Sequence, residues 1–345
     1  MKEKINVAVI GTGFGALVHI PAYHLNDKYN LVGVYGRNID KASSVAKEYG
    51  IKVYKSKEEI ALDSTVDMVS ISSIVSEHIS DVKMFLNKKY IVLEKPMSIN
   101  FEDANILKLL CEENGIKTAI CHEHKYDPSW KYVKYLITSK QYGSMRCIYF
   151  NYSFTYWNSE RSARKFDWFS LKQYGGGIIG GHLSHVLDLI LYLDNAGIKE
   201  INGNGYIEVK EHYDANGEVQ KQTAEDTVFA SAMTYSGVPV YIDLSASRFE
   251  TYKKVTIYTE KAKITICGQN EIKITNRSGE VIESDIPSDY IIKDYGKDSR
   301  LNSFMIFLDE FYMGYIENKE TSITDFNKGC IIQKLIDKIK VYEDE

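Results

Sequence analysis

The feature that most constrains this chain is a short apolar run that enters a glycine-rich turn close to the N-terminus. Residues 5–10 (INVAVI) are mostly β-branched and apolar, which is typical of a buried parallel strand. They lead into Gly11, Gly13 and Ala16, which have the Gly-x-Gly-x-x-Ala spacing of a dinucleotide-binding turn. We expect Gly11 to allow a sharp turn, Gly13 to admit a pyrophosphate, and Ala16 to hold the next helix close to the strand. The N-terminus of that helix would face the phosphates, whereas the alternative is a structural turn that binds nothing.

Short apolar strands and helices alternate over the first third of the chain. We expect strands at 31–35, 52–54, 67–72, 90–93 and 118–121, and helices at 40–49, from 57, from 76 and at 100–114. Asn38 and Asn100 suit the starts of two helices, and Gly50 and Gly115 suit their ends. The alternation predicts an α/β Rossmann domain, with a doubly wound and mostly parallel sheet, over residues 1–122.

The pattern changes beyond Asp127-Pro128. Strands are expected at 146–154, 201–212, 227–235, 238–249, 255–259, 262–267 and 271–275, and many are joined by short turns. Helices are expected at 129–139, from Gly177 to Leu193, at 300–318 and at 325–342. Residues 123–345 therefore predict an α+β domain with a large, mostly antiparallel open sheet. We expect the outer face of this sheet to form an interface between copies, and the C-terminal helices to pack back on the first domain.

Composition excludes several classes of partner. The 345 residues carry a formal net charge of −5, which offers no electrostatic basis for binding nucleic acid or an anionic membrane. The five cysteines include no Cys-x-x-Cys pair, so we expect buried thiols and no disulfide framework. Neither a leader segment nor an apolar run long enough to span a bilayer is apparent, and we expect a cytoplasmic protein.

The end of the second expected strand bears on the choice of cofactor. It runs into Gly36, Arg37 and Asn38, with no acidic residue to bind both ribose hydroxyls of NAD. A guanidinium there suits a 2′-phosphate or the adenine face. We therefore expect NADP(H) as the cofactor, with NAD(H) as the alternative. If Arg37 has no function, it is a solvated surface arginine.

Glu94-Lys95-Pro96 follows an expected strand at the edge where open α/β sheets place their ligands. Beside a bound nicotinamide, Lys95 would be partly desolvated and suited to donate a proton. The Lys95–Pro96 peptide bond can be cis or trans. The alternative is a solvated loop lysine.

A second group of candidates follows the glycine run Gly175–Gly177. His182, His185 and Asp188 are three residues apart and would share one face of a helix. A histidine there could take part in a proton relay. The alternative is a set of buried, hydrogen-bonded histidines at a loosened helix start.

A zinc site is a further alternative for the histidines. His122 and His124 would share one face of a strand, and His182 with His185 could add two ligands. Neither pair has a recognisable metal-site framework around it, so we expect no metal. His19, His24 and His212 are interpreted as structural or solvated.

Together these residues resemble the Gfo/Idh/MocA oxidoreductase family, named for glucose–fructose oxidoreductase, inositol dehydrogenase and a rhizopine-catabolism protein. The resemblance covers essentially the whole chain, and the Glu-Lys-Pro tripeptide in this place is its most specific part. The other residues that carry it are Gly11–Phe14, Val18-His19-x-Pro21, His78, Asp127-Pro128, Gly175–Gly177, His185 and Asp188.

The resemblance implies an NAD(P)-dependent oxidoreductase that acts on a CH–OH or C=O group of a sugar, keto-sugar or polyol-like substrate lying between two domains. It implies that Lys95 is the catalytic acid/base, that His185 contacts the reacting oxygen, and that the sheet domain forms a homodimer or homotetramer. Cofactor contacts are expected from Gly11, Thr12, Gly13, Phe14, Gly15, Arg37, Asn38, Ser72, His78, Glu94 and Lys95. Substrate contacts are expected from Lys95, His124, Tyr156, Trp157, Arg164, Trp168, His182 and His185, with Arg161 in the same aromatic stretch.

One departure from the family pattern concerns the second group. Many members have an Asp four residues before the histidine that corresponds to His185, and this chain has Gly181 there. A carboxylate that would orient that histidine is missing, although His182 or Asp188 could partly replace it. Lys125 in place of a common Arg is a milder change. The departure keeps open a second hypothesis, a cofactor-binding sensor or regulatory protein of the same fold with weak or no turnover.

Overall fold

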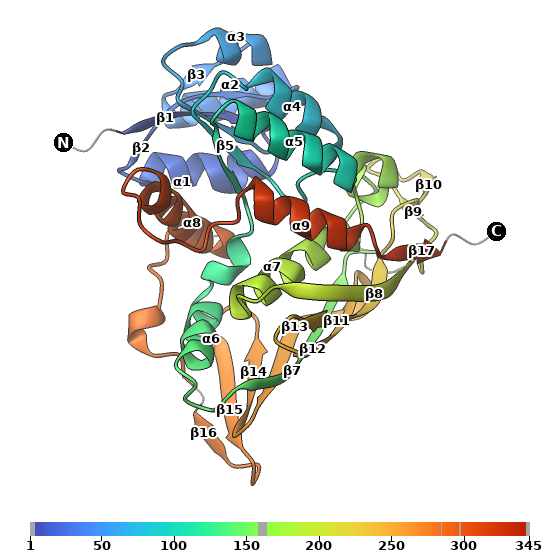
Figure 1. Ribbon diagram of the computed structural model, residues 1–345. Helices are drawn as coiled ribbons and strands as arrows, with labels where there is room; N and C mark the ends of the chain where they lie inside the picture. The colour runs from blue at the N-terminus through green and yellow to red at the C-terminus, as the bar shows by residue number, and fades with distance from the viewer. Residues whose placement is uncertain (1–3, 158–163, 284, 297, 343–345) are drawn as a thin grey trace. The chain divides into compact units, whose positions relative to one another are not determined.

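The computed structural model of the protein describes residues 4–157, 164–283, 285–296 and 298–342, which form two compact units (Figure 1). Unit 1 comprises residues 1–126 and 293–333, and unit 2 comprises residues 127–292 and 334–345. In sequence, the larger segment of unit 2 (127–292) is therefore inserted into unit 1, and its shorter segment follows unit 1.

Unit 1 is built on a six-stranded parallel sheet with the strand order β3-β2-β1-β4-β5-β6. The strands are β1 (Ile5–Ile10), β2 (Tyr29–Tyr35), β3 (Lys52–Val53), β4 (Met68–Ile71), β5 (Tyr90–Leu93) and β6 (Lys117–Ile120). The helices are α1 (Ile20–Leu25), α2 (Ile39–Tyr49), α3 (Lys57–Leu62), α4 (His78–Met84), α5 (Phe101–Glu113), α8 (Ser299–Tyr315) and the larger part of α9 (Phe326–Ile336). The order is that of a doubly wound Rossmann domain, so the predicted fold class of this part is confirmed.

Two apolar clusters cover the two faces of this sheet, as the alternation of side chains along a strand requires. Val7 and Val9 of β1 pack in one cluster with α1, α2 and α8, while Ala8 and Ile10 pack in the other with α3, α4, α5 and α9. Blue and red segments, from opposite ends of the chain, therefore lie side by side in Figure 1.

Local signals set the ends of two helices in unit 1. The side chain of Asn38 accepts a hydrogen bond from the Lys41 N–H at 2.9 Å at the start of α2. Gly50 ends α2 in the left-handed conformation, with φ +66°. Asn100 caps α5 through the Asp103 N–H at 2.8 Å. The predicted caps of α2 and α5 are thus confirmed.

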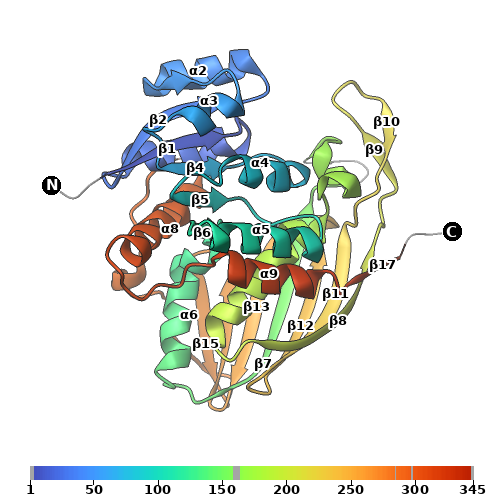
Figure 2. The same ribbon diagram turned by 45° about the horizontal axis from the view of Figure 1, so that its top comes forward.

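Unit 2 contains a nine-stranded sheet in the order β16-β15-β14-β13-β7-β12-β11-β8-β17 (Figure 2). The strands are β7 (Met145–Thr155), β8 (Ile198–Tyr206), β11 (Thr227–Thr234), β12 (Pro239–Ser245), β13 (Ser247–Thr259), β14 (Ala262–Cys267), β15 (Glu271–Asn276), β16 (Val281–Glu283) and β17 (Lys340–Tyr342). A separate hairpin consists of β9 (Glu211–Tyr213) and β10 (Val219–Lys221). The pairing is antiparallel except for β7 with β12 and β8 with β17, so the predicted mostly antiparallel sheet is confirmed.

Two helices of unit 2 are α6 (Pro128–Thr138) and α7 (Ser184–Leu193), and α6 packs Trp130 on Phe150 of the sheet. Residues 172–193 are long and apolar enough, by length and composition, to cross a membrane, contrary to our expectation that no such run exists. Because 72% of their most apolar window is buried within the protein, we interpret this segment as a core helix.

Three predicted elements differ from the structure. The helix expected at 325–342 ends at Ile336, and the last described residues form β17 beside β8. The strand expected at 201–212 is split between β8 and β9, which belong to different sheets. The strand expected at 238–249 breaks between β12 and β13, because these two strands pair with opposite edges of β7. Such long-range pairing leaves no signal in local periodicity.

Candidate functional site

The glycine loop of unit 1 is shaped by contacts with the strand ends around it. Gly11 has φ +109°, and a Cβ there would lie 2.3 Å from the Ser72 carbonyl oxygen, so only glycine fits. A Cβ at Gly15 would lie 3.2 Å from Val9 Cγ1, whereas Ala16 is only half-buried. The close packing of helix on strand that we assigned to Ala16 therefore occurs at Gly15. The helix begins with a π-helical turn, Gly15–His19, closed by the Ile20 N–H on the Gly15 carbonyl.

Two observations at this loop fit a bound dinucleotide. A Cβ at Gly13 would meet no atom within 4 Å, so nothing in the protein itself demands glycine there. Within the described parts of the chain, the buried Oγ of Ser72 has no hydrogen-bond partner. An open approach over Gly13 and an unpartnered hydroxyl next to Gly15 are what a phosphate or ribose oxygen would use.

The tip after β2 is held beside this loop. The Gly11 N–H bonds to the Tyr35 carbonyl at 2.8 Å. A Cβ at Gly36 would lie 2.6 Å from Thr12 Cγ2, which shows how closely the tip approaches the loop. Arg37 and Asn38 are exposed, and the Asn38 side-chain oxygen is already used to cap α2. The exposed Arg37 thus directly follows the residue that packs on the loop.

Glu94 and Lys95 begin the loop after β5, next to the end of β4, because the Glu94 N–H bonds to the Ile71 carbonyl at 2.9 Å. The Glu94 carboxylate pairs with Nε2 of the fully buried His19 at 2.9 Å, and His19 Nδ1 lies 2.8 Å from Ser70 Oγ. Burial alone would raise the pKa of Glu94, but the hydrogen bond from His19 and the charges of His19 and Lys95 bring that pKa below its usual value. Glu94 is therefore a carboxylate, and it places negative charge next to Lys95. Lys95 is half-buried, and the Lys95–Pro96 bond is cis.

His78, expected to contact the cofactor, is fully buried between two loops. Its Nδ1 lies 3.2 Å from the Met97 carbonyl and its Nε2 lies 3.3 Å from the Ser73 carbonyl. Burial lowers the pKa of His78, so the ring is neutral and donates to one of these carbonyls at a time. In this structure the ring ties the loop after β4 to the loop after β5.

The placement assumed for a metal site at His122 and His124 is wrong. β6 ends at Ile120, and Glu123–Tyr126 form a single 3₁₀ turn, so these histidines do not alternate on a strand. Donor atoms of His19, Glu94 and Cys121 do lie within 4.8 Å of one another. Burial raises the pKa of the Cys121 thiol well above its usual value, which keeps the thiol protonated and disfavours metal binding.

In unit 2 the glycine run leads into a π-helical turn, Ile179–Leu183, and then into α7. His182 therefore stands on the π turn, and His185 and Asp188 are buried on α7. The ring of His182 stacks on Phe154 with centroids 4.2 Å apart, and its Nε2 lies 3.4 Å from the Tyr156 hydroxyl. Because a π turn precedes the α-helix, the three-residue spacing between His182 and His185 does not place them on one ordinary α-helical face.

Phe169 occupies the space beside Gly181. A Cβ at Gly181 would lie 2.7 Å from two ring carbons of Phe169, so a larger residue there requires the ring to move. The same ring stacks on Trp157 at 5.2 Å. Phe169 is a residue that no local sequence signal marks, because its partners lie 12 residues away in each direction.

The other expected substrate residues differ in how much surface they offer. Trp157 is fully buried, so it belongs to the core of unit 2. Arg164 pairs with Asp167 through two hydrogen bonds of 3.1 and 2.7 Å, and its guanidinium lies over Phe169. Tyr156, Trp168 and His182 remain half-buried. His124 is also half-buried, and Arg161 lies outside the described residues.

The C-terminal part of unit 1 supplies a residue that sequence analysis missed. Arg300, near the start of α8, lies with its guanidinium 4.8 Å from the ring of Phe14 in the glycine loop. Asp298 holds that guanidinium through hydrogen bonds of 2.9 and 2.5 Å. The separation of almost the whole chain between Phe14 and Arg300 explains why no sequence signal links them.

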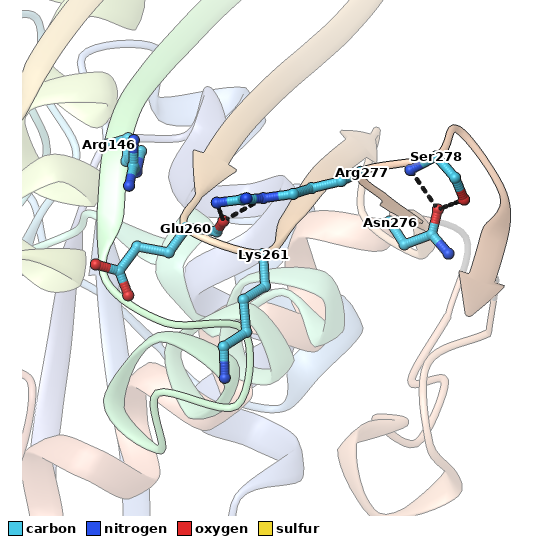
Figure 3. A pocket seen from close by; sticks show the side chains of 6 residues that line it. All are labelled: Arg146, Glu260, Lys261, Asn276, Arg277 and Ser278. Atoms are coloured by element: carbon cyan, nitrogen blue, oxygen red, sulfur yellow. Dashed lines mark hydrogen bonds between the residues drawn. The ribbon is translucent and has the colours of Figure 1, made fainter.

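A surface pocket of about 690 Å³ lies apart from these candidates, at turns between strands of unit 2 (Figure 3). The Arg277 side chain reaches across to the Glu260 carbonyl, with hydrogen bonds of 2.9 and 2.6 Å. Asn276 accepts hydrogen bonds from the N–H and the hydroxyl of Ser278. These bonds brace the turns, and the pocket is lined by residues outside the candidate list.

Comparison with known proteins gives matches over most of the chain. Residues 5–122 match "Oxidoreductase family, NAD-binding Rossmann fold" (GFO_IDH_MocA), and residues 130–265 match "GFO/IDH/MocA C-terminal domain". An uncharacterized oxidoreductase of Synechocystis sp. is 26% identical over 99% of this chain and 95% of its own length. Glucose-6-phosphate 3-dehydrogenase of Bacillus subtilis is 25% identical over 54% of this chain and 53% of its own length. Levoglucosan dehydrogenase in complex with NADH and L-sorbose has a TM-score of 0.85 at 17% identity, covering 98% of this chain and 96% of that chain, which shows the shared fold.

Proposed function

Because this chain belongs to the Gfo/Idh/MocA oxidoreductase family, we propose that it is an NADP(H)-preferring oxidoreductase that acts on a CH–OH or C=O group of a sugar, keto-sugar or polyol-like substrate. The observation that carries the proposal is the edge of the parallel sheet, where the open approach over Gly13 and the unpartnered hydroxyl of Ser72 meet the loop of Glu94 and Lys95. The sugar-dehydrogenase relative supports the substrate class.

A bound nicotinamide would supply or accept the hydride. In the proposed reaction Lys95 gives a proton to, or takes one from, the substrate oxygen, and its ammonium group stabilises negative charge that develops there. The Glu94 carboxylate, fixed by His19, keeps a negative charge beside that ammonium group. His185 contacts the same substrate oxygen, and the half-buried Tyr156, Trp168 and His182 are the proposed wall of the sugar site.

A turnover experiment tests the role of Lys95. We expect Lys95→Met to lower kcat roughly 10²- to 10⁴-fold, because the proton donor is removed, while the Kd for NADPH rises by a much smaller factor, because Lys95 is one of several expected cofactor contacts. Lys83→Met, which replaces an exposed lysine of the same unit, is the matched control. Unchanged turnover in Lys95→Met would rule out the proposed acid/base.

The cofactor preference rests on Arg37 at the exposed tip. Titration of the purified protein with NADPH and NADH, followed by nicotinamide fluorescence, should give tighter NADPH binding. Arg37→Gln should weaken NADPH binding about 10- to 100-fold, because a charge-assisted hydrogen bond is lost, and should leave NADH binding unchanged. Lys41→Gln, also exposed, serves as the control. Tighter binding of NADH by the wild type would remove Arg37 from the site.

A sensor without turnover is the second candidate, and the space beside Gly181 favours it. The resemblance implies an Asp at this position in many members, and here Phe169 stands where such a side chain would begin. NADPH binding combined with no NADPH consumption across a panel of keto-sugars would favour the sensor. Consumption with any of them would favour the enzyme.

We also propose that the protein is a cytoplasmic homodimer or homotetramer that assembles through the nine-stranded sheet. Tyr149, Phe229, Tyr241 and Tyr258, on four of its strands, are each between 42% and 46% exposed. Tyr149 and Tyr241 stack at 4.7 Å and form the centre of this patch. Light scattering at micromolar concentration should show the oligomer, and a monomer would contradict this part of the proposal.

A further inference from the structure

A buried carboxylate closes the glycine turn that precedes the histidine-bearing helix of unit 2. Glu225 lies just before β11 and is 5% exposed. Its Oε1 accepts a hydrogen bond from the Ile179 N–H at 3.0 Å, and its backbone carbonyl accepts one from the Ile178 N–H at 2.9 Å. A residue 46 positions further along the chain thus holds the first amide groups of the helical run that ends at Leu193.

The turn leaves room for this carboxylate. Gly177 has φ +102°, and a Cβ there would lie 2.2 Å from Glu225 Oε1. A Cβ at Gly205 of β8 would lie 2.9 Å from Ile179 Cδ1 and 3.4 Å from Glu225 Cγ. A side chain at Gly177 or Gly205 would push the Glu225 carboxylate and Ile179 apart. Both glycines therefore preserve the hydrogen bond between Glu225 and Ile179.

Ile179 connects Glu225 to the candidate histidines. The Ile179 N–H donates to the Glu225 carboxylate. The Ile179 carbonyl accepts the Ser184 N–H, and this bond closes the π turn that carries His182. His185 follows immediately on α7. A shift of Ile179 would therefore move the backbone on which both histidines stand.

We propose that Glu225 is a positioning residue, which holds His182 and His185 in their orientation by capping the helix that carries them. This inference rests on the proposed function, because it takes these histidines to meet the substrate. Glu225 itself contacts the helix start and acts through it.

The charges around Glu225 give this role a signature. Burial raises the pKa of Glu225 to about 7, although the hydrogen bond from Ile179 and the charge of Lys172 act in the opposite direction and Asp226 adds to the rise. Among the described residues, Lys172 and Asp226 are the charged groups that shift the pKa of Glu225. A neutral carboxyl accepts a weaker hydrogen bond than a carboxylate, so the cap weakens as the pH falls through about 7.

Two variants separate the shape of the side chain from its charge. Glu225→Gln keeps the size and an acceptor oxygen but does not titrate, and Glu225→Ala removes the cap. Glu218→Gln, at an exposed position before β10, is the control. Each variant is studied as the full-length protein by NMR, which reports the Ile179 amide and the ring signals of His182 and His185, and by NADPH titration.

In the wild type we expect the Ile179 amide signal to follow a transition near pH 7 that is absent in Glu225→Gln. In Glu225→Ala we expect Ile179 amide exchange to be about tenfold faster and the two histidine rings to shift, while Glu225→Gln restores the ring signals and the Kd for NADPH is unchanged in all variants. Identical histidine signals in wild type and Glu225→Ala would overturn the inference.

Turnover gives a separate outcome. Where a substrate is found, Glu225→Ala should raise KM for it at least tenfold, and an unchanged KM and kcat would also overturn the positioning role. If the wild type consumes no substrate, the proposed enzyme function fails, while the histidine signals still decide whether Glu225 positions the two rings.

Discussion

The helix α8 is an integral part of unit 1, although it follows residues 127–292 of unit 2 in the sequence. We predict that a fragment of residues 1–126, which holds all six strands of the parallel sheet but lacks α8, does not fold. The reason is the apolar surface that α8 covers, since the cluster on one face of the sheet draws much of its volume from this helix.

The magnitude follows from the side chains that α8 buries. Those that are at most 5% exposed and belong to the cluster are Leu301, Phe304, Met305, Phe307, Leu308, Phe311 and Tyr312. At roughly 1.5–3 kcal/mol for each fully buried side chain, they contribute on the order of 10–20 kcal/mol as an upper estimate. A domain's net free energy of unfolding is only about 5–15 kcal/mol, so the loss of α8 exceeds what unit 1 can tolerate.

The assay compares two proteins by circular dichroism and thermal unfolding. The fragment 1–126 should show no cooperative transition, whereas residues 1–126 joined by a flexible Gly/Ser linker to residues 293–333 should melt cooperatively. The fusion controls for the loss of unit 2, because both proteins lack it. A cooperative, reversible transition in the fragment alone would refute the reasoning that α8 completes this core.

Three further predictions concern single sites. Ile332→Ala should lower the free energy of unfolding by roughly 2–5 kcal/mol in urea denaturation, because Ile332 is 2% exposed, while its neighbour Ile331 is 50% exposed and should cost at most about 1 kcal/mol when changed to Ala. Gly181→Ala should lower the melting temperature, and the free energy of unfolding by roughly 1–3 kcal/mol, because the new Cβ meets the ring of Phe169. Adding Phe169→Leu to this variant should recover part of the loss. An unchanged melting temperature in Gly181→Ala would contradict the contact. Burial raises the pKa of Glu225 from 4.5 to about 7, which means that burying the charge costs more than the stronger hydrogen bond of the carboxylate returns. Although the cap itself is weaker in the protonated form, the net stabilising contribution of Glu225 is therefore complete below about pH 4.5 and is lost as the pH rises to about 7, by roughly 3 kcal/mol. Glu225→Gln should flatten this part of the stability–pH curve, and equal slopes in wild type and variant would show that Glu225 does not titrate there.

Much of unit 1 could be predicted from sequence because its signals are local. The strand before Gly11, the cap at Asn38 and the left-handed Gly50 each depend on residues within one or two turns. The same holds for the loop of Glu94 and Lys95 after β5, which a strand pattern alone places at the sheet edge. These elements match the structure to within a few residues.

The rest depended on contacts between distant residues. The sequence around Gly181 does not indicate a contact with Phe169, and the sequence around Ile179 does not indicate a bond to Glu225, because each pair meets only after the chain has folded. His19 is a structural histidine, as expected, but its bond to the carboxylate next to Lys95 joins residues 75 positions apart and left no local signal. The strand placement expected for His122 and His124 was wrong, because β6 ends at Ile120 and a 3₁₀ turn follows it.

The insertion of unit 2 into unit 1 also has a consequence for synthesis of the protein. The six parallel strands leave the ribosome about 180 residues before α8 begins to do so. At roughly 5–20 residues per second, the nascent sheet waits on the order of 10–30 s with one apolar face uncovered. Unit 2, by contrast, lacks only its short second segment, which contains β17, when residue 292 has been made. We therefore expect unit 2 to acquire its structure first on the ribosome, and unit 1 to be completed only after α8 has been made.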